Sequence, residues 1–96
     1  MLIRVFRASV RPGAEADYDR ILREVAIPSL QKQPGLIALH VGHGLPSSLD
    51  EYVMVSVWKD FEAMKAWTGD DWWHAVVYPG EARLVTESHV DHFETF

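Results

Sequence analysis

The sequence contains no cysteine, and this absence excludes several classes of chemistry at once. Disulfide bonds, thiolate nucleophiles, zinc fingers and iron–sulfur clusters all depend on cysteine thiols. Basic residues are also scarce, because 9 lysines and arginines face 14 aspartates and glutamates and leave a formal net charge of −5. No basic stripe is present, so nucleic acid is not an expected partner.

Long apolar runs are missing as well. No apolar segment approaches the roughly 18 residues that a membrane-spanning helix needs, so no membrane partner is expected. Residues 1–7 carry Arg4 and Arg7 within an apolar stretch, which predicts a β-strand in preference to a signal peptide. The resulting expectation is a cytoplasmic protein.

The 96 residues suffice for one domain, residues 1–96, in which we find no repeat, linker or low-complexity segment. The apolar pattern and the turn residues predict the element order βαββαβ. Strands are expected at residues 2–10, 36–42, 51–58 and 84–93, helices at 14–27, 61–68 and 70–77, and a hairpin loop at 44–48. Pro28 should end or kink the first helix, although a further turn through Lys32 fits the pattern.

This order is that of the ferredoxin-like split βαβ unit, an α+β fold in which helices cover one face of a four-stranded antiparallel sheet. A sheet with one open face usually alternates apolar and polar residues, but the third strand is apolar on both faces. Its faces are Tyr52, Met54 and Trp58 on one side and Val53, Val55 and Val57 on the other. A second subunit would cover the face that the helices leave open, so the sequence predicts a homodimer. Without it, the face of Tyr52 and Met54 would be an exposed apolar patch.

All four tryptophans lie within one short stretch beside the third strand. Trp67 shares a helix face with Met64 and lies near Phe61, so these side chains form either a core plug or the wall of a flat aromatic pocket. Trp72 and Trp73 would point about 100° apart on a helix, and one of them can face that pocket. The sequence leaves open which one does.

Two polar residues could give this aromatic cluster a chemical function. His74 follows the tryptophan pair, and a histidine with an ordinary pKa near 6.5 suits proton transfer, although an exposed surface histidine is the alternative. Arg7 lies on an otherwise apolar strand face, and a buried arginine needs a partner. That partner is either a carboxylate, such as Glu87 or Asp91, or an anionic substrate oxygen.

The remaining histidines do not predict a metal site. His40 and His43 are three residues apart, as are His89 and His92, and an odd spacing places two strand residues on opposite faces. His40 and His89 could meet only if their strands approached each other across a dimer.

The run Val57-Trp58-Lys59 is followed by Ala63-Met64-Lys65-Ala66-Trp67, and Pro-Gly pairs flank the first helix. Together with the βαββαβ order, these motifs resemble the antibiotic biosynthesis monooxygenase superfamily over essentially the whole chain. The resemblance implies a dimeric α+β barrel. Known members include cofactor-free oxygenases of polyketide quinones, quinol monooxygenases and haem-degrading monooxygenases.

The haem-degrading branch can be compared residue by residue. Its strand-one asparagine falls on Arg7, and its helix tryptophan falls on Trp67, which matches. Its haem-ligating histidine falls on Val77, whereas His74 lies about one helical turn earlier. Two of the three positions differ, so no cofactor is the first expectation and haem is the alternative.

The resemblance favours a cofactor-independent monooxygenase that acts on a small flat aromatic, such as a quinol or a polyketide anthrone. In this hypothesis Trp67 orients the substrate, His74 accepts a proton and Arg7 stabilises the developing negative charge. The substrate-binding wall would be formed by Trp72, Trp73, Met64 and Phe61. The alternatives are a haem-degrading monooxygenase and a non-catalytic dimeric module that binds a small ligand. A cavity beside Trp67 that contained both His74 and Arg7 would favour the enzyme.

Overall fold

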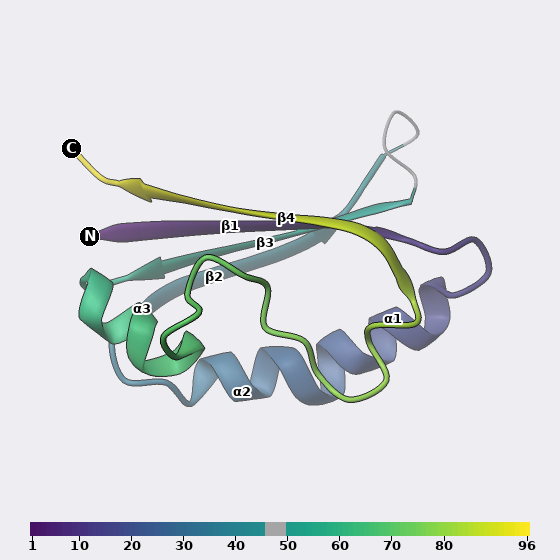
Figure 1. Ribbon diagram of the computed structural model, residues 1–96, viewed down its shortest axis with the longest axis horizontal. Coiled ribbons are helices and arrows are strands. Elements are labelled where there is room, and N and C mark those ends of the chain that lie inside the picture. Colours follow the sequence, from purple (N-terminus) through teal and green to yellow (C-terminus); the bar gives the residue numbers. More distant parts are fainter. Residues whose placement is uncertain (46–49) are drawn as a thin grey trace.

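The computed structural model describes residues 1–45 and 50–96 of the chain (Figure 1). Four strands form one antiparallel sheet in the order β2-β3-β1-β4. The strands are β1 (Leu2–Val10), β2 (Leu36–His43), β3 (Glu51–Trp58) and β4 (Val85–Glu94). This arrangement confirms the predicted ferredoxin-like fold. Residues 46–48 of the expected hairpin loop lie outside the described residues.

The first helical segment is longer than predicted and changes its winding part-way. It consists of α1 (Glu15–Ile21), a π-helical turn η1 (Leu22–Ala26) and α2 (Ile27–Gln31). The N–H of Ile27 bonds to the carbonyl of Leu22, five residues earlier. A proline within a regular α-helix lacks an N–H and clashes with the carbonyl four residues before it. The wider π-helical turn just before Pro28 relieves that clash, so the helix continues past the proline.

Helix α3 (Phe61–Thr68) matches its predicted bounds and carries the expected caps. The side chain of Asp60 accepts a hydrogen bond from the N–H of Ala63 at 2.8 Å, and Gly69 ends the helix with a φ of 87°. Gly35 brings the start of β2 against this helix, because a Cβ at that position would lie 2.6 Å from the Cβ of Ala63. Figure 1 shows α3 and the first helical segment on the same face of the sheet.

The predicted helix at residues 70–77 is wrong. Residues 69–84 form turns and irregular backbone that run along the helix-covered face of the sheet (Figure 1). The physical reason is that the carbonyls of Trp72 and His74 accept hydrogen bonds from the side chain of Arg4 and not from a helical backbone. Two adjacent β-branched residues and Pro79 further disfavour a helix here.

Odd- and even-numbered residues of each strand lie on opposite faces of the sheet, and the helices cover one of these faces. Even-numbered residues of β1 and β3 face the helices, and Tyr52 and Met54 are buried there, with 7% and 9% of their surface exposed. They pack with Tyr18, Leu22 and the other core residues because the bulkier strand face fills the space beneath the helices. The open face is therefore that of Val53, Val55 and Val57, and the expectation of a Tyr52–Met54 patch is corrected. In the described part of the chain, every helix is too short or too polar to span a bilayer.

Candidate active site

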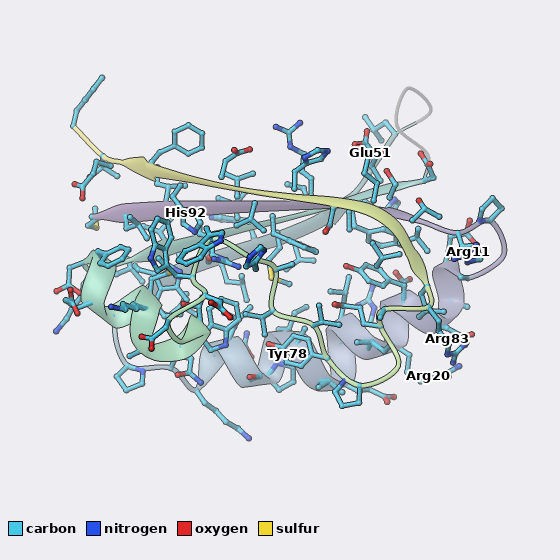
Figure 2. All side chains as sticks on the ribbon, in the orientation of Figure 1. Arg11, Arg20, Glu51, Tyr78, Arg83 and His92 are labelled. Atoms are coloured by element: carbon cyan, nitrogen blue, oxygen red, sulfur yellow. The ribbon has the colours of Figure 1, made fainter. Side chains whose placement is uncertain are left out.

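A cavity of about 20 Å³ lies between the sheet and the helical layer. Residues from β1, β3, η1, α2, α3 and the 69–84 loop contribute to its wall. They are Arg4, Phe6, Leu22, Ala26, Leu30, Met54, Ser56, Trp67, Val76, Tyr78 and Glu81. The volume corresponds to about one water molecule. Tyr78 of the loop and His92 of β4 both lie on this side of the sheet (Figure 2).

Arg4 is a buried cation at this cavity, with 2% of its surface exposed. Its Nη1 donates to the carbonyl of Trp72 at 2.8 Å and its Nη2 to that of His74 at 3.0 Å. The guanidinium carbon lies 5.3 Å from the centre of the Trp67 ring, within the range of a cation–π contact. Burial lowers the pKa of Arg4 to about 10, which leaves it charged at neutral pH. No carboxylate of the described residues forms a salt bridge with it, so backbone dipoles and not a counter-anion hold this charge.

Glu81 places a buried acid in the wall of the same cavity. It comes from the 69–84 loop, and only 4% of its surface is exposed. Burial raises the pKa of the Glu81 carboxyl to about 7, and a backbone hydrogen bond from Tyr78 partly opposes that rise. A carboxyl that titrates near neutral pH can both accept and return a proton under physiological conditions. Within residues 1–45 and 50–96, Glu81 forms no salt bridge.

Two tyrosine hydroxyls are buried beside these charges without a hydrogen-bond partner in the described chain, those of Tyr18 and Tyr78. Burial raises the pKa of Tyr18, and the nearby Glu81 and Tyr52 raise it further. An unsatisfied buried hydroxyl costs about 1–3 kcal/mol. Tyr78 lines the cavity, so its hydroxyl is expected to meet a water molecule or a polar atom of a ligand there.

The aromatic wall of the cavity is Trp67. Its ring stacks on that of Trp58, with centroids 5.5 Å apart and planes at 21°. Trp58 is fully buried, and its Nε1 donates to the Oγ of Ser56 at 3.0 Å. Trp67 thus packs on the core with one face and contributes to the cavity, which combines the two functions that the sequence left as alternatives.

A larger cleft of about 270 Å³ adjoins the cavity. Phe6 and Glu81 belong to the walls of both, and the remaining wall of the cleft comes from the 69–84 loop and the start of β4. Ala75, Ala82 and Ser88 are among its small wall residues. This cleft is a route from the surface to Glu81.

The family model of antibiotic biosynthesis monooxygenases matches residues 1–78. The chain belongs to this family. Solved structures agree with the fold: a conserved protein from Methanosarcina mazei Go1 superposes with a TM-score of 0.80 at 18% identity, over 100% of this chain and 94% of that one. Among curated proteins, no sequence matches this chain significantly.

Two further structural relatives have informative names. SnoaB, a cofactor-independent oxygenase from Streptomyces nogalater, gives a TM-score of 0.74 at 22% identity, over 99% of this chain and 92% of that one. A mutant of MhuD with two manganese protoporphyrin IX molecules per active site also gives 0.74, at 17% identity, over 99% and 94% of the two chains. At these identities the likeness establishes a shared fold.

The structure does not bring Arg7 and His74 together with Trp67. Arg7 is three residues from Arg4 on the same strand, so it lies on the opposite, open face and is exposed. The side chain of His74 is exposed in the loop, and its backbone carbonyl, not its imidazole, contacts Arg4. The ion pair expected for Arg7 is not formed within the described chain, since Glu87 pairs with His89 at 2.9 Å.

The four residues predicted as the substrate-binding wall are not among those that line the cavity. Met64 is fully buried in the core, and Trp72 packs edge-to-face on Phe61 with centroids 5.1 Å apart. Trp73 is the outward member of the tryptophan pair, with 53% of its surface exposed. The residues that the sequence reading missed are Arg4, Tyr78 and Glu81. Of these, Arg4 could have been predicted to lie on the helix-covered face, because it lies on the same face of the strand as Leu2 and Phe6.

The residues of this family member do not fit haem at the position that the resemblance implies. Val77 occupies the ligand position, offers no ligand atom and is 57% exposed. No histidine lines the cavity, so its wall offers no imidazole to an iron atom. Over residues 1–45 and 50–96, no cluster of histidines and carboxylates could hold a metal ion.

Proposed function

We propose that the chain is a cofactor-independent monooxygenase of a small, flat, acidic aromatic, such as a quinol or an anthrone. One observation carries this proposal: a buried cation and a buried acid, Arg4 and Glu81, line one cavity beside Trp67 without pairing with each other. A substrate that loses a proton to the acid becomes an anion next to the cation. The name of SnoaB, a cofactor-independent oxygenase, supports the same class of reaction.

Glu81 is the proposed base. A carboxyl whose pKa is about 7 is a far stronger base than an ordinary glutamate, and it is partly ionised at neutral pH. The acidic C–H or O–H group of a quinol or an anthrone can therefore transfer its proton to Glu81. This role replaces the one expected for His74, which is exposed and does not line the cavity.

Arg4 is the proposed stabiliser of the anion. Its contacts with Trp72 and His74 fix the guanidinium, and charge interactions are strong in a site that excludes water. Arginine has five N–H donors. Its Nε forms no hydrogen bond with any described residue, so a donor remains for a substrate oxygen.

For an anthrone, which carries an acidic CH₂ group, the chemistry balances without an external reductant. The carbon that has lost its proton to Glu81 transfers electrons to dioxygen and forms a C–O bond. Glu81 returns the proton to the peroxide, which then loses water and leaves a carbonyl. One oxygen atom remains in the product and the other leaves as water, with both of its hydrogens from the substrate CH₂ group. The protein supplies the base, the cation and the flat wall of Trp67.

Binding requires the site to open, because the cavity of about 20 Å³ holds a water molecule and not an aromatic ring. The adjoining cleft of about 270 Å³ reaches Glu81 and Phe6 from the surface. Outward movement of the 69–84 loop would join the two spaces. The proposed substrate then enters along this loop with its acidic group directed at Glu81.

Oxygen consumption with a reduced naphthoquinone and with an anthrone tests the proposal. Glu81→Gln should lower the turnover rate by roughly 10²–10⁴-fold, the usual contribution of a general base. His74→Gln is the matched comparison, and it should match the parent because the imidazole is exposed. A large loss in His74→Gln with full activity in Glu81→Gln would restore His74 as the base. Absence of turnover above autoxidation, with ligand binding retained, would favour the non-catalytic binding module.

A further inference from the structure

A hydrogen bond on the cavity side of the sheet fixes the protonation state of His92. The Nη1 of Arg4 lies 2.9 Å from the Nε2 of His92, and the two residues are directly paired between β1 and β4. Arginine carries donors and no acceptor, so Nε2 has to be the acceptor. The structure therefore requires a neutral His92 whose ring hydrogen is on Nδ1.

Arg4, His92 and Trp72 form a compact unit between the sheet and the 69–84 loop. The Nη1 atom that contacts His92 also donates to the carbonyl of Trp72. The Trp72 ring in turn meets the His92 ring edge-on, with centroids 5.0 Å apart. His92 thus contacts both the guanidinium and the loop residue to which that guanidinium is bound.

We propose that neutral His92 is a positioning residue that holds the Arg4 guanidinium against the cavity wall, and that protonation of His92 releases it. A protonated imidazole carries a hydrogen on Nε2 and a positive charge, so it would face the Arg4 cation at hydrogen-bond distance. Loss of this contact would also free the carbonyls of Trp72 and His74 from Arg4. The consequence for catalysis rests on the proposed function, because Arg4 is the group assigned to the substrate anion.

The surroundings of His92 set the pH at which this occurs. From β1 it faces Arg4, and from the loop it faces the uncharged Trp72 ring, while the Met64 sulfur lies 3.9 Å from the same Nη1 atom of Arg4. On its own strand, its charged neighbour is Asp91. Burial and then Arg4 lower the pKa of His92 below its ordinary value, and Asp91 partly opposes them. Neutral His92 therefore predominates at physiological pH, and release is expected under acidic conditions.

Two measurements without turnover test the proposal. Long-range ¹H–¹⁵N NMR at neutral pH should show the His92 hydrogen on Nδ1, whereas a proton on Nε2 would overturn it. Hydrogen exchange of residues 72–78, corrected for the intrinsic rate, should show a protected loop at neutral pH and an open one at an acidic pH at which the NMR spectrum shows His92 protonated. Equal protection at these two pH values in the parent would also overturn it.

Variants separate titration from packing. In His92→Gln, an amide oxygen can accept from Arg4 but does not titrate, so the loop opening that follows His92 protonation in the parent should disappear, while any change that follows the Glu81 carboxyl of the same loop remains. His92→Leu lacks an acceptor and should leave the loop open at both pH values. His89→Gln, at an exposed position of β4, is the matched control and should behave as the parent. Persistence of the parental pH dependence in His92→Gln would contradict the proposal.

Catalysis gives a third readout. In the oxygen assay, the ratio of His92→Gln to parental turnover should rise about tenfold for each pH unit below the His92 pKa, because the neutral fraction of the parental imidazole falls by that factor. A constant ratio in an active enzyme would refute the positioning role. Absence of turnover in the parent would refute the proposed function, while the NMR and exchange results would still decide the fate of the His92 contact.

Discussion

Replacement of Glu81 by glutamine should make the protein more stable while it removes the proposed base. Glu81 is buried, and burial raises the pKa of its carboxyl from 4.5 to about 7. Ionisation of this carboxyl therefore costs more free energy in the folded state than in the unfolded chain, where the side chain is solvated. Glutamine is nearly the same size and never ionises, so Glu81→Gln should remove this penalty.

The sign and size of the effect follow from proton binding. Between pH 4.5 and about 7, the folded protein holds a proton on Glu81 that the unfolded chain has released. Unfolding thus releases a proton, and the free energy of unfolding falls as the pH rises through this window. Each pH unit corresponds to about 1.4 kcal/mol, so the parent should lose up to about 3 kcal/mol. That is a large part of the roughly 5–15 kcal/mol that stabilises a small domain.

Urea denaturation at fixed protein concentration measures this difference. At about pH 4 the parent and Glu81→Gln should have similar unfolding free energies, because the parental carboxyl is neutral in both states. At about pH 8 the variant should be more stable by up to about 3 kcal/mol. Glu24→Gln, an exposed carboxyl of the π-helical turn, is the control and should change stability by less than about 0.5 kcal/mol.

The reasoning would be refuted by the opposite order of stabilities. A Glu81→Gln protein that is less stable than the parent at about pH 8 would show that the ionised carboxyl is stabilised by a cation, with Arg4 as the obvious partner. Equal stabilities at both pH values would show that water solvates Glu81 freely. Either result would also remove the base from the proposed mechanism, since both imply an ordinary or lowered pKa.

Two further predictions concern the aromatic wall and the open sheet face. Trp67→Phe keeps an aromatic ring on Trp58 but removes the indole N–H. The rate of oxygen consumption should therefore fall by roughly tenfold, which corresponds to the loss of one hydrogen bond. Parental activity in this variant would show that Trp67 serves only in packing. Light scattering should give a homodimer of about twice 10.9 kDa, and Val55→Glu on the open face should yield monomers, whereas Val77→Glu on the exposed loop should not. A monomeric parent at micromolar concentration would refute the dimer.

Much of the fold could be predicted because its signals are local. The bounds of β1 and β3 follow from runs of apolar residues, and those of α3 follow from caps such as Asp60 and Gly69, which act within a few residues. The helix predicted at residues 70–77 failed for the opposite reason. Its carbonyls are satisfied by Arg4, which is about seventy positions away in the sequence, and no local pattern contains that partner.

The sequence analysis and the structure both place Trp67 at the candidate site, but they differ in the arginine and the acid–base group that lie beside it. The sequence reading found an arginine on an apolar strand, a proton acceptor near the tryptophans and the wall Trp67. The sequence analysis selected Arg7, although Arg4 lies on the face of β1 that carries Phe6 and the buried residues of the strand. Once Tyr52, Met54 and Trp58 are assigned to the helix-covered face, the antiparallel register places Arg4 opposite Ser56 on that same face. This step needs the pairing of two strands and therefore exceeds the information in either one alone.

Glu81 had no sequence signal, because an isolated glutamate near a Pro-Gly turn is usually solvated. Its burial results from the loop as a whole: Arg4 binds the loop at Trp72 and His74, and Leu84 packs into the core at its far end. The segment between these two attachments, including Tyr78 and Glu81, is thereby held over the cavity. A buried cation thus positions the loop that carries the buried acid. The ionisation of Glu81 and the unsatisfied tyrosine hydroxyls both lower the free energy of unfolding. In the proposed mechanism this loss of stability keeps a base, a cation and an aromatic wall together before the substrate binds.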